Sequence, residues 1–130
     1  MNTFSIKSKT EKEVIDLTNQ LNSIVAGLNT KDGILFLFVK HTTCSLSVAD
    51  LDPGTDKDYL EAIEKMFPEG NYRHPHDPSH VGDHIMSSII NPSVVLPIKN
   101  GTLDLGTWQS VVLIELNGPR DREIVYKIIE

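Results

Sequence analysis

The chain has 130 residues, of which 39% are apolar, and this length and composition suit one domain over residues 1–130 with its own core. Its 12 Lys and Arg residues against 18 Asp and Glu residues give a net charge of −6, which excludes broad attraction to nucleic acid or to an anionic membrane. Cys44 is the only cysteine and the N-terminal segment lacks the features of a signal peptide, so we expect a cytoplasmic protein without disulfides.

The first half of the chain predicts extended segments separated by two helices. Alternating apolar residues indicate a strand over Thr3–Lys9, and helical spacing indicates a helix over Thr18–Ala26 with its first residue as the N-cap. The continuous apolar run Ile34–Val39 is typical of a buried strand, and extended structure resumes over Ser45–Val48. A second helix is expected over Thr55–Phe67, after a segment that contains Pro and Gly.

The second half of the chain predicts a loop, a third helix and further strands. Pro68–Pro78 is dense in Pro, His, Asp and Asn, which is typical of an irregular loop, and a short helix is expected over His80–Ile90. Three more strands are expected over Ser93–Ile98, Trp108–Leu116 and Glu123–Ile129. These elements predict an α+β fold with a largely antiparallel sheet or sandwich and about three helices.

Histidines gather in one part of the chain. His74, His76, His80 and His84 fall within eleven residues, and His41 directly follows the apolar run. Neutral imidazole is a strong ligand for Zn²⁺ and similar ions, so the clustering favours a divalent metal or substrate site. A solvated loop with incidental histidines is the alternative interpretation.

A second group of polar residues follows the same apolar run. The hydroxyls of Thr42, Thr43 and Ser45 could donate to phosphate oxygens, and His41 could act as a ligand or as an acid/base group. A turn rich in Ser and Thr is the alternative. Cys44 invites a nucleophile hypothesis, but a lone cysteine beside a strand is more often a small buried hydrophobe.

Two arginines follow a turn near the C-terminus. Arg120 and Arg122 have the guanidinium group that suits bidentate capture of phosphate or carboxylate, although surface pairing with Asp121 and Glu123 is an equal alternative. Trp108 is expected to pack in the core or in a subunit interface.

Several segments together resemble the YjbQ-like family. They are HTTCSLSV from His41, YRH from Tyr72, DHIMSSI from Asp83, SVVLPIKNGTLDLGTWQ from Ser93 and GPRDR from Gly118. The resemblance implies a compact α+β domain that assembles as a homotrimer. It also implies a thiamine-phosphate synthase activity like that of some members, in which a pyrimidine pyrophosphate is joined to a thiazole phosphate.

The resemblance also implies roles for individual residues. His41, His74 and His84 correspond to family histidines and are expected to bind a divalent metal, with zinc the favoured ion, and His41 and His84 are also candidate catalytic groups. Asp50 stands where members have Glu and is a candidate acid/base group. The expected substrate-binding residues are Thr42, Thr43, Ser45, Arg120 and Arg122. Two alternatives stay open: a metal-dependent hydrolase of a small phosphorylated substrate, and a non-catalytic trimeric protein that binds a metal or ligand.

Overall fold

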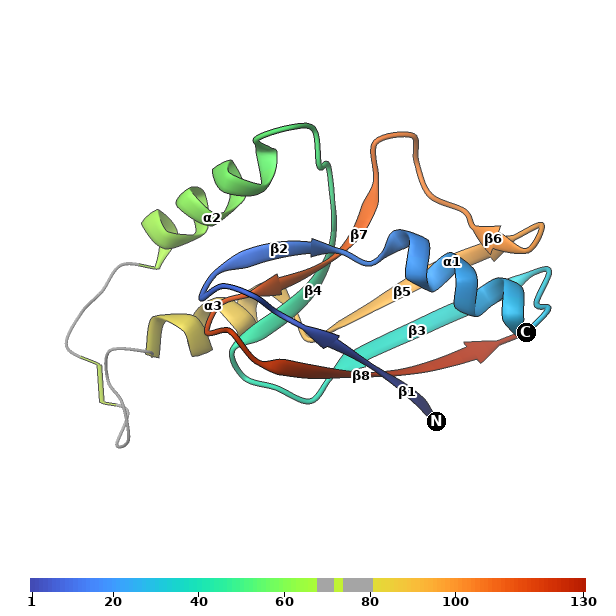
Figure 1. The fold of residues 1–130 in the computed structure, drawn as a ribbon, viewed down its shortest axis with the longest axis horizontal. Coiled ribbons are helices and arrows are strands. Elements are labelled where there is room, and N and C mark those ends of the chain that lie inside the picture. Colours follow the sequence, from blue (N-terminus) through green and yellow to red (C-terminus); the bar gives the residue numbers. More distant parts are fainter. Residues whose placement is uncertain (68–71, 74–80) are drawn as a thin grey trace.

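The computed structural model describes residues 1–67, 72–73 and 81–130 (Figure 1). The elements in these residues confirm an α+β fold with antiparallel sheets and three helices. The part of the predicted loop that contains His74 and His76, together with His80, lies outside the described residues. In chain order the elements are β1 (Asn2–Lys7), β2 (Glu13–Asp16), α1 (Thr18–Gly27), β3 (Gly33–Val39), β4 (Cys44–Ala49), α2 (Thr55–Met66), α3 (Val81–Ile90), β5 (Ser93–Lys99), β6 (Thr102–Leu103), β7 (Ser110–Glu115) and β8 (Asp121–Ile129).

The strands in the described ranges form two antiparallel sheets. One has the order β1-β8-β3-β5-β6 and the other the order β2-β7-β4. Alternate side chains of β3 point inward, so Leu35, Leu37 and Val39 are buried. They join Leu46 of β4 and Leu113 of β7 in the main apolar core, which therefore draws on both sheets.

Helix α1 contributes Leu21 and Val25 to the same core, because its apolar residues recur at helical spacing. The predicted N-cap is wrong: Leu17 holds that position and makes no side-chain capping bond. The hydroxyl of Thr18 instead accepts a hydrogen bond from the backbone N–H of Val111 at 2.9 Å. A contact with a distant strand thus replaces the local one that the sequence suggested.

The other two helices lie beside the three-stranded sheet. Met86 of α3 packs with Val112 and Ile114 of β7 in a second, smaller apolar cluster. Lys12, in the β1–β2 turn, reaches both helices, with its Nζ 3.4 Å from Glu64 Oε1 of α2 and 3.2 Å from Asp83 Oδ1 of α3. The turn between two strands thereby holds both helices near one end of the sheet.

Trp108 does not lie in the core of the chain, so the first of its two expected places is wrong. Its side chain is 69% exposed in the loop before β7. The loop is closed by two hydrogen bonds between Gly106 and Gln109, one of 2.8 Å from the Gly106 N–H to Oε1 and one of 3.0 Å from the Gln109 N–H to the glycine carbonyl. These bonds fix a turn that leaves the indole in solvent. Packing in a subunit interface stays a prediction.

Candidate functional site

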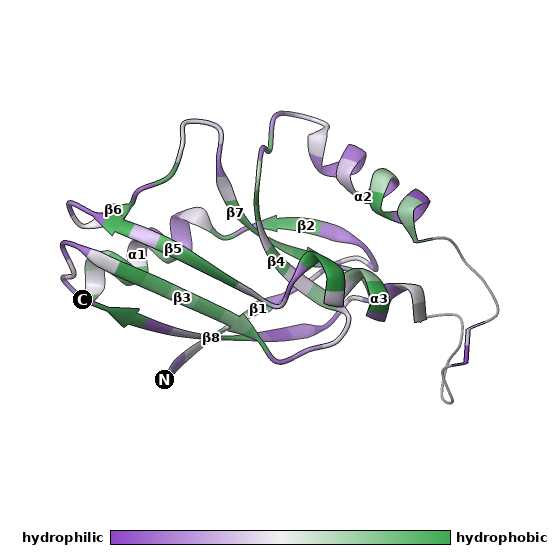
Figure 2. Cartoon of the chain, turned by 180° about the vertical axis from the view of Figure 1, so that it is seen from behind, coloured by the Kyte–Doolittle hydropathy of each residue, from purple (hydrophilic) through white to green (hydrophobic). Residues whose placement is uncertain are grey.

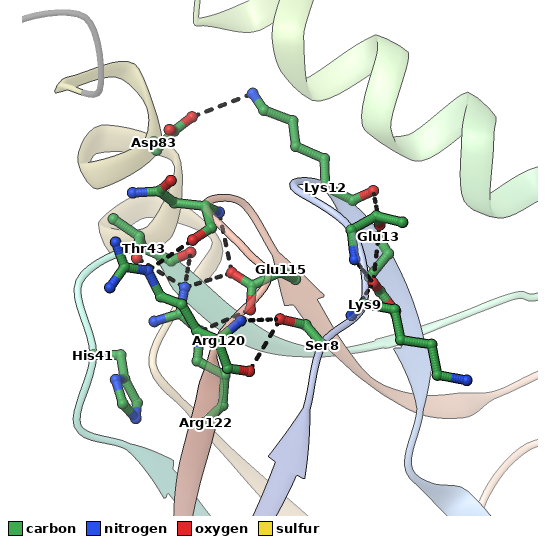
Figure 3. A network of polar contacts seen from close by, with 12 residues as sticks. Ser8, Lys9, Lys12, Glu13, His41, Thr43, Asp83, Glu115, Arg120 and Arg122 are labelled. Atoms are coloured by element: carbon green, nitrogen blue, oxygen red, sulfur yellow. Dashed lines mark hydrogen bonds and ion pairs between the residues drawn. The ribbon is translucent and has the colours of Figure 1, made fainter.

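The ends of several strands meet at one end of the fold. The antiparallel register places Lys7 opposite Asp121, Cys44 opposite Glu115 and Val39 opposite Ile124. The β3–β4 loop, the β7–β8 turn and the residues after β1 therefore come together, although they are far apart in sequence. The polar residues from these segments that we describe next are drawn in Figure 3.

A buried ion pair forms the centre of this end. The side chains of Arg122 and Glu115 are 2% and 0% exposed, and Arg122 donates from Nε and one terminal nitrogen to the two carboxylate oxygens. The same terminal nitrogen donates to the carbonyl oxygen of Thr43 at 3.0 Å and to its hydroxyl at 2.8 Å. Burial alone would raise the pKa of Glu115, but the hydrogen bonds from Arg122 and Asn117 outweigh it and hold the pKa below its ordinary value.

Arg120 lies on the surface two residues before the buried arginine. Its backbone N–H donates to Ser8 Oγ at 2.9 Å, and its carbonyl oxygen accepts from the Ser8 N–H at 2.9 Å, which fixes the turn. The guanidinium Nε donates to the carbonyl oxygen of Asn117 at 2.8 Å. Within the described part of the chain, the two terminal nitrogens make no hydrogen bond, so this fork can receive a ligand.

His41 is half-buried in the β3–β4 loop, and its ring is held by a backbone contact. The Glu123 N–H donates to His41 Nε2 at 3.0 Å, so Nε2 is the acceptor and the proton of the neutral ring is on Nδ1. Burial and the positive charge of Arg122 lower the pKa of His41 below its ordinary value, and the charge of Arg120 adds to this. At neutral pH the ring is an uncharged donor at Nδ1.

The remaining predicted residues are distributed differently from what the sequence suggests. Thr42 is exposed next to His41, whereas Ser45 is buried and its hydroxyl donates to the Ser87 carbonyl oxygen at 2.8 Å. Asp50 follows the opposite end of β4, roughly 20 Å from the start of that strand at about 3.3 Å per residue. Its Oδ1 accepts from the Asp52 N–H at 2.9 Å, which makes a local turn. The structure therefore does not bring Asp50 to His41.

Cys44 is fully buried at the start of β4. Burial raises the pKa of its thiol to about 11, so the thiol stays protonated at neutral pH. This environment is that of a small packed hydrophobe and not of a nucleophile.

The proposed metal ligands are only partly within the described residues. His84 lies in α3 directly after Asp83, the residue that Lys12 holds at this end of the fold. His74 lies outside the described residues, as do His76 and His80. In the described ranges, no group of three or more His, Cys, Asp or Glu side chains could hold a metal ion. The described residues alone therefore do not form the expected histidine-bound zinc site.

Sequence reasoning missed Glu115, Ser8 and Lys12, which are needed to build this end of the fold. Glu115 had a detectable signal, because a carboxylate stands between Ile114 and Leu116 in an otherwise apolar run. A charge in such a run needs a buried partner. Ser8 and Lys12 carried no comparable signal.

Comparison with known proteins identifies the family. The family described as "UPF0047 protein YjbQ-like" matches residues 2–130. The chain belongs to this family. A UPF0047 protein of Archaeoglobus fulgidus is 33% identical over 126 residues, which is 96% of this chain and 98% of the relative. The UPF0047 protein YugU of Bacillus subtilis is 28% identical and covers 99% of this chain and 98% of its own length.

Solved structures of YjbQ-like proteins share the fold. A protein of this family from Clostridium acetobutylicum is 34% identical, with a TM-score of 0.90 over 99% of this chain and all of its own. A hypothetical protein from Aeropyrum pernix has a TM-score of 0.91 at 29% identity, covering 98% of this chain and 96% of its own.

These findings correct the functional expectation. The descriptions of the family and of these relatives name no activity, so nothing supports a thiamine-phosphate synthase. The expected synthase is therefore wrong, and the described residues form no group of side chains that could hold a metal ion. The divalent ion itself stays a prediction, because its expected ligand His74 lies outside the described residues.

Within the described residues, no helix is long and apolar enough to cross a membrane.

Proposed function

We propose that this chain binds a small phosphorylated molecule at the end of the fold that contains Arg120 and His41. The observation that carries the proposal is the exposed Arg120 guanidinium, whose terminal nitrogens make no hydrogen bond within the described residues. His41 and Arg120 lie at the same end of the fold (Figure 3), where the N–H of Glu123, three residues after Arg120, donates to His41 Nε2 at 3.0 Å. An arginine fork and a neutral imidazole N–H are both donors that match phosphate oxygens.

The buried ion pair supports this proposal because it fixes the loop at the site and does not itself offer a charge to the ligand. Glu115 neutralises Arg122, and both side chains are inaccessible, so neither contacts a ligand. Arg122 instead binds the carbonyl oxygen and hydroxyl of Thr43, which fixes the loop that carries His41 and Thr42. In this proposal Arg122 and Thr43 are positioning residues, and Arg120, His41 and Thr42 contact the phosphate.

We expect Arg120→Ala to weaken binding of inorganic pyrophosphate by tenfold or more, because a hydrogen bond to a charged group contributes about 1.5–3 kcal/mol. Isothermal titration calorimetry at low salt measures the affinity. Arg120→Lys keeps the charge but not the fork, and it should bind with intermediate affinity. Lys57→Ala removes an exposed cation of α2 from outside this site and is the matched control. Equal affinity in the wild type and Arg120→Ala would refute the site.

The same titration has a second readout in the His41 ring. A bound anion stabilises the imidazolium form, so pyrophosphate should raise the pKa of His41 from its lowered value. An NMR titration of the ring Hε1 proton measures this change, and the shift should be small in Arg120→Ala. A His41 pKa that does not respond to pyrophosphate in the wild type would place the ligand elsewhere.

We also propose that the chain assembles as a homotrimer. An apolar outer face on the five-stranded sheet supports self-association, since Ile34, Val95 and Ile129 are exposed there. Figure 2 shows β3, β5 and β8 with no helix across this face. Light scattering should give a mass near three times 14.5 kDa. A mass near 14.5 kDa at micromolar concentration would contradict the assembly.

A further inference from the structure

A cavity of about 180 Å³ lies between α2 and the three-stranded sheet. Ser47 and Ala49 of β4 and Val112 of β7 line it from the sheet, and Tyr59 and Ile63 line it from the helix. No residue of α2 is buried, so the helix covers the sheet without filling the space beneath it. The cavity involves none of the residues of the proposed phosphate site.

Small side chains explain why the space exists. Ser47 pairs with Val112, and Ala49 pairs with Ser110, so β4 presents short side chains where a larger residue could close the gap. Protein interiors are close-packed, and voids much larger than a water molecule are uncommon. Engineered apolar cavities of about 150 Å³ stay dry and bind benzene. A cavity of this size is therefore large enough for one aromatic ring.

We propose that this cavity binds a small neutral molecule with one aromatic ring or an apolar group of similar size. Among the described residues, no Asp, Glu, Lys, Arg or His side chain lines it, so a charged ligand would lose its hydration without compensation. The hydroxyls of Ser47 and Tyr59 make no hydrogen bond within the described residues and can bond a single polar group of the ligand.

The size of the cavity selects a small molecule over a protein partner. A stable interface between proteins covers about 800 Å² on each partner. A space of about 180 Å³ between a helix and a sheet cannot offer such an area, and α2 blocks the approach of a second helix or strand. If a second copy of this chain bound here instead, filling the cavity would change the mass of the assembly measured by light scattering.

Phenol is a suitable probe because it combines one ring with one hydroxyl. We expect saturable shifts of methyl NMR signals, confined to residues that line the cavity, when phenol is added to the full chain. Ala49→Leu fills the space and should reduce affinity at least tenfold. Ala62→Leu adds the same volume to the exposed side of α2 and should leave binding unchanged. Benzoate, which is charged, should bind at least tenfold more weakly than phenol.

Several outcomes would overturn the proposal. They are the absence of saturable shifts in the wild type, equal phenol affinity in Ala49→Leu and the wild type, or equal affinity for benzoate. If Ala49→Leu fails to fold, Ser47→Val is a smaller change. It reduces the volume of the cavity and removes one hydroxyl from its wall, and it should weaken phenol binding severalfold. A change of assembly mass in Ala49→Leu, measured by light scattering, would assign the cavity to contact between copies instead.

Discussion

Glu115→Ala should lower the free energy of unfolding by about 3–5 kcal/mol, because it leaves the guanidinium of Arg122 buried without a counter-charge. Urea denaturation followed by circular dichroism measures this loss. The pKa of Glu115 lies below its ordinary value of 4.5, so its contribution is complete above that pH and is lost as the pH falls through the lowered pKa. The wild type should therefore lose more stability than Glu115→Ala on acidification below about pH 4.5.

Two further variants separate the effect of burial from the effect of charge. Glu64→Ala removes an acid whose side chain is 55% exposed beside Lys12, and it should cost less than about 1 kcal/mol. The double change Glu115→Leu with Arg122→Leu leaves no stranded charge and should recover most of the stability. A loss below about 1 kcal/mol in Glu115→Ala would mean that water reaches Arg122, contrary to the burial found here.

Gly118→Ala should cost about 3 kcal/mol of folding free energy. A Cβ atom at this position would lie 2.7 Å from Ser8 Oγ and would also overlap the carbonyl oxygen of Thr10. The turn cannot easily shift away, because the Gly118 N–H donates to the Glu11 carbonyl oxygen at 2.8 Å. Thermal denaturation measures the loss, and the displaced turn should also weaken pyrophosphate binding by Arg120.

Gly27→Ala is the matched control for this glycine. Gly27 is the last residue of α1, and a Cβ atom there would meet nothing within 4 Å. Alanine is the better helix former by up to about 1 kcal/mol, so this variant should be as stable as the wild type or slightly more stable. Equal stability of Gly118→Ala and the wild type would contradict the close approach of the β7–β8 turn to the residues after β1.

Local patterns predicted most of the elements of the fold. The continuous run in β3 and the helical spacing in α1 and α2 are long enough to be read from sequence. The strands β2 and β6 were missed because a segment of four or two residues shows no period of its own. Such short strands form because longer neighbours supply their hydrogen-bond partners: β7 pairs with β2, and β5 pairs with β6.

The candidate site was predictable in its residue types but not in their roles. The motif around Arg120 and Arg122 indicated two equivalent guanidinium groups. In the structure, Arg120 is exposed, whereas Arg122 is 2% exposed and forms an ion pair with Glu115. Their positions in the chain explain the difference, since Arg120 lies in the turn before β8 whereas Arg122 is an inward residue of the strand. Asp50 was grouped with His41 from the resemblance, but β4 separates them.

The sequence by itself determined the α+β class and the strand β3, and it indicated Arg120 and His41 as candidate ligand-binding residues, because periodicity and side-chain chemistry are local properties. Only the tertiary structure decided that Arg122 pairs with Glu115 and binds Thr43, 79 residues away in the chain. Such contacts depend on strand register, and a shift of one residue would turn each side chain to the opposite face. Composition and spacing carry no record of that register.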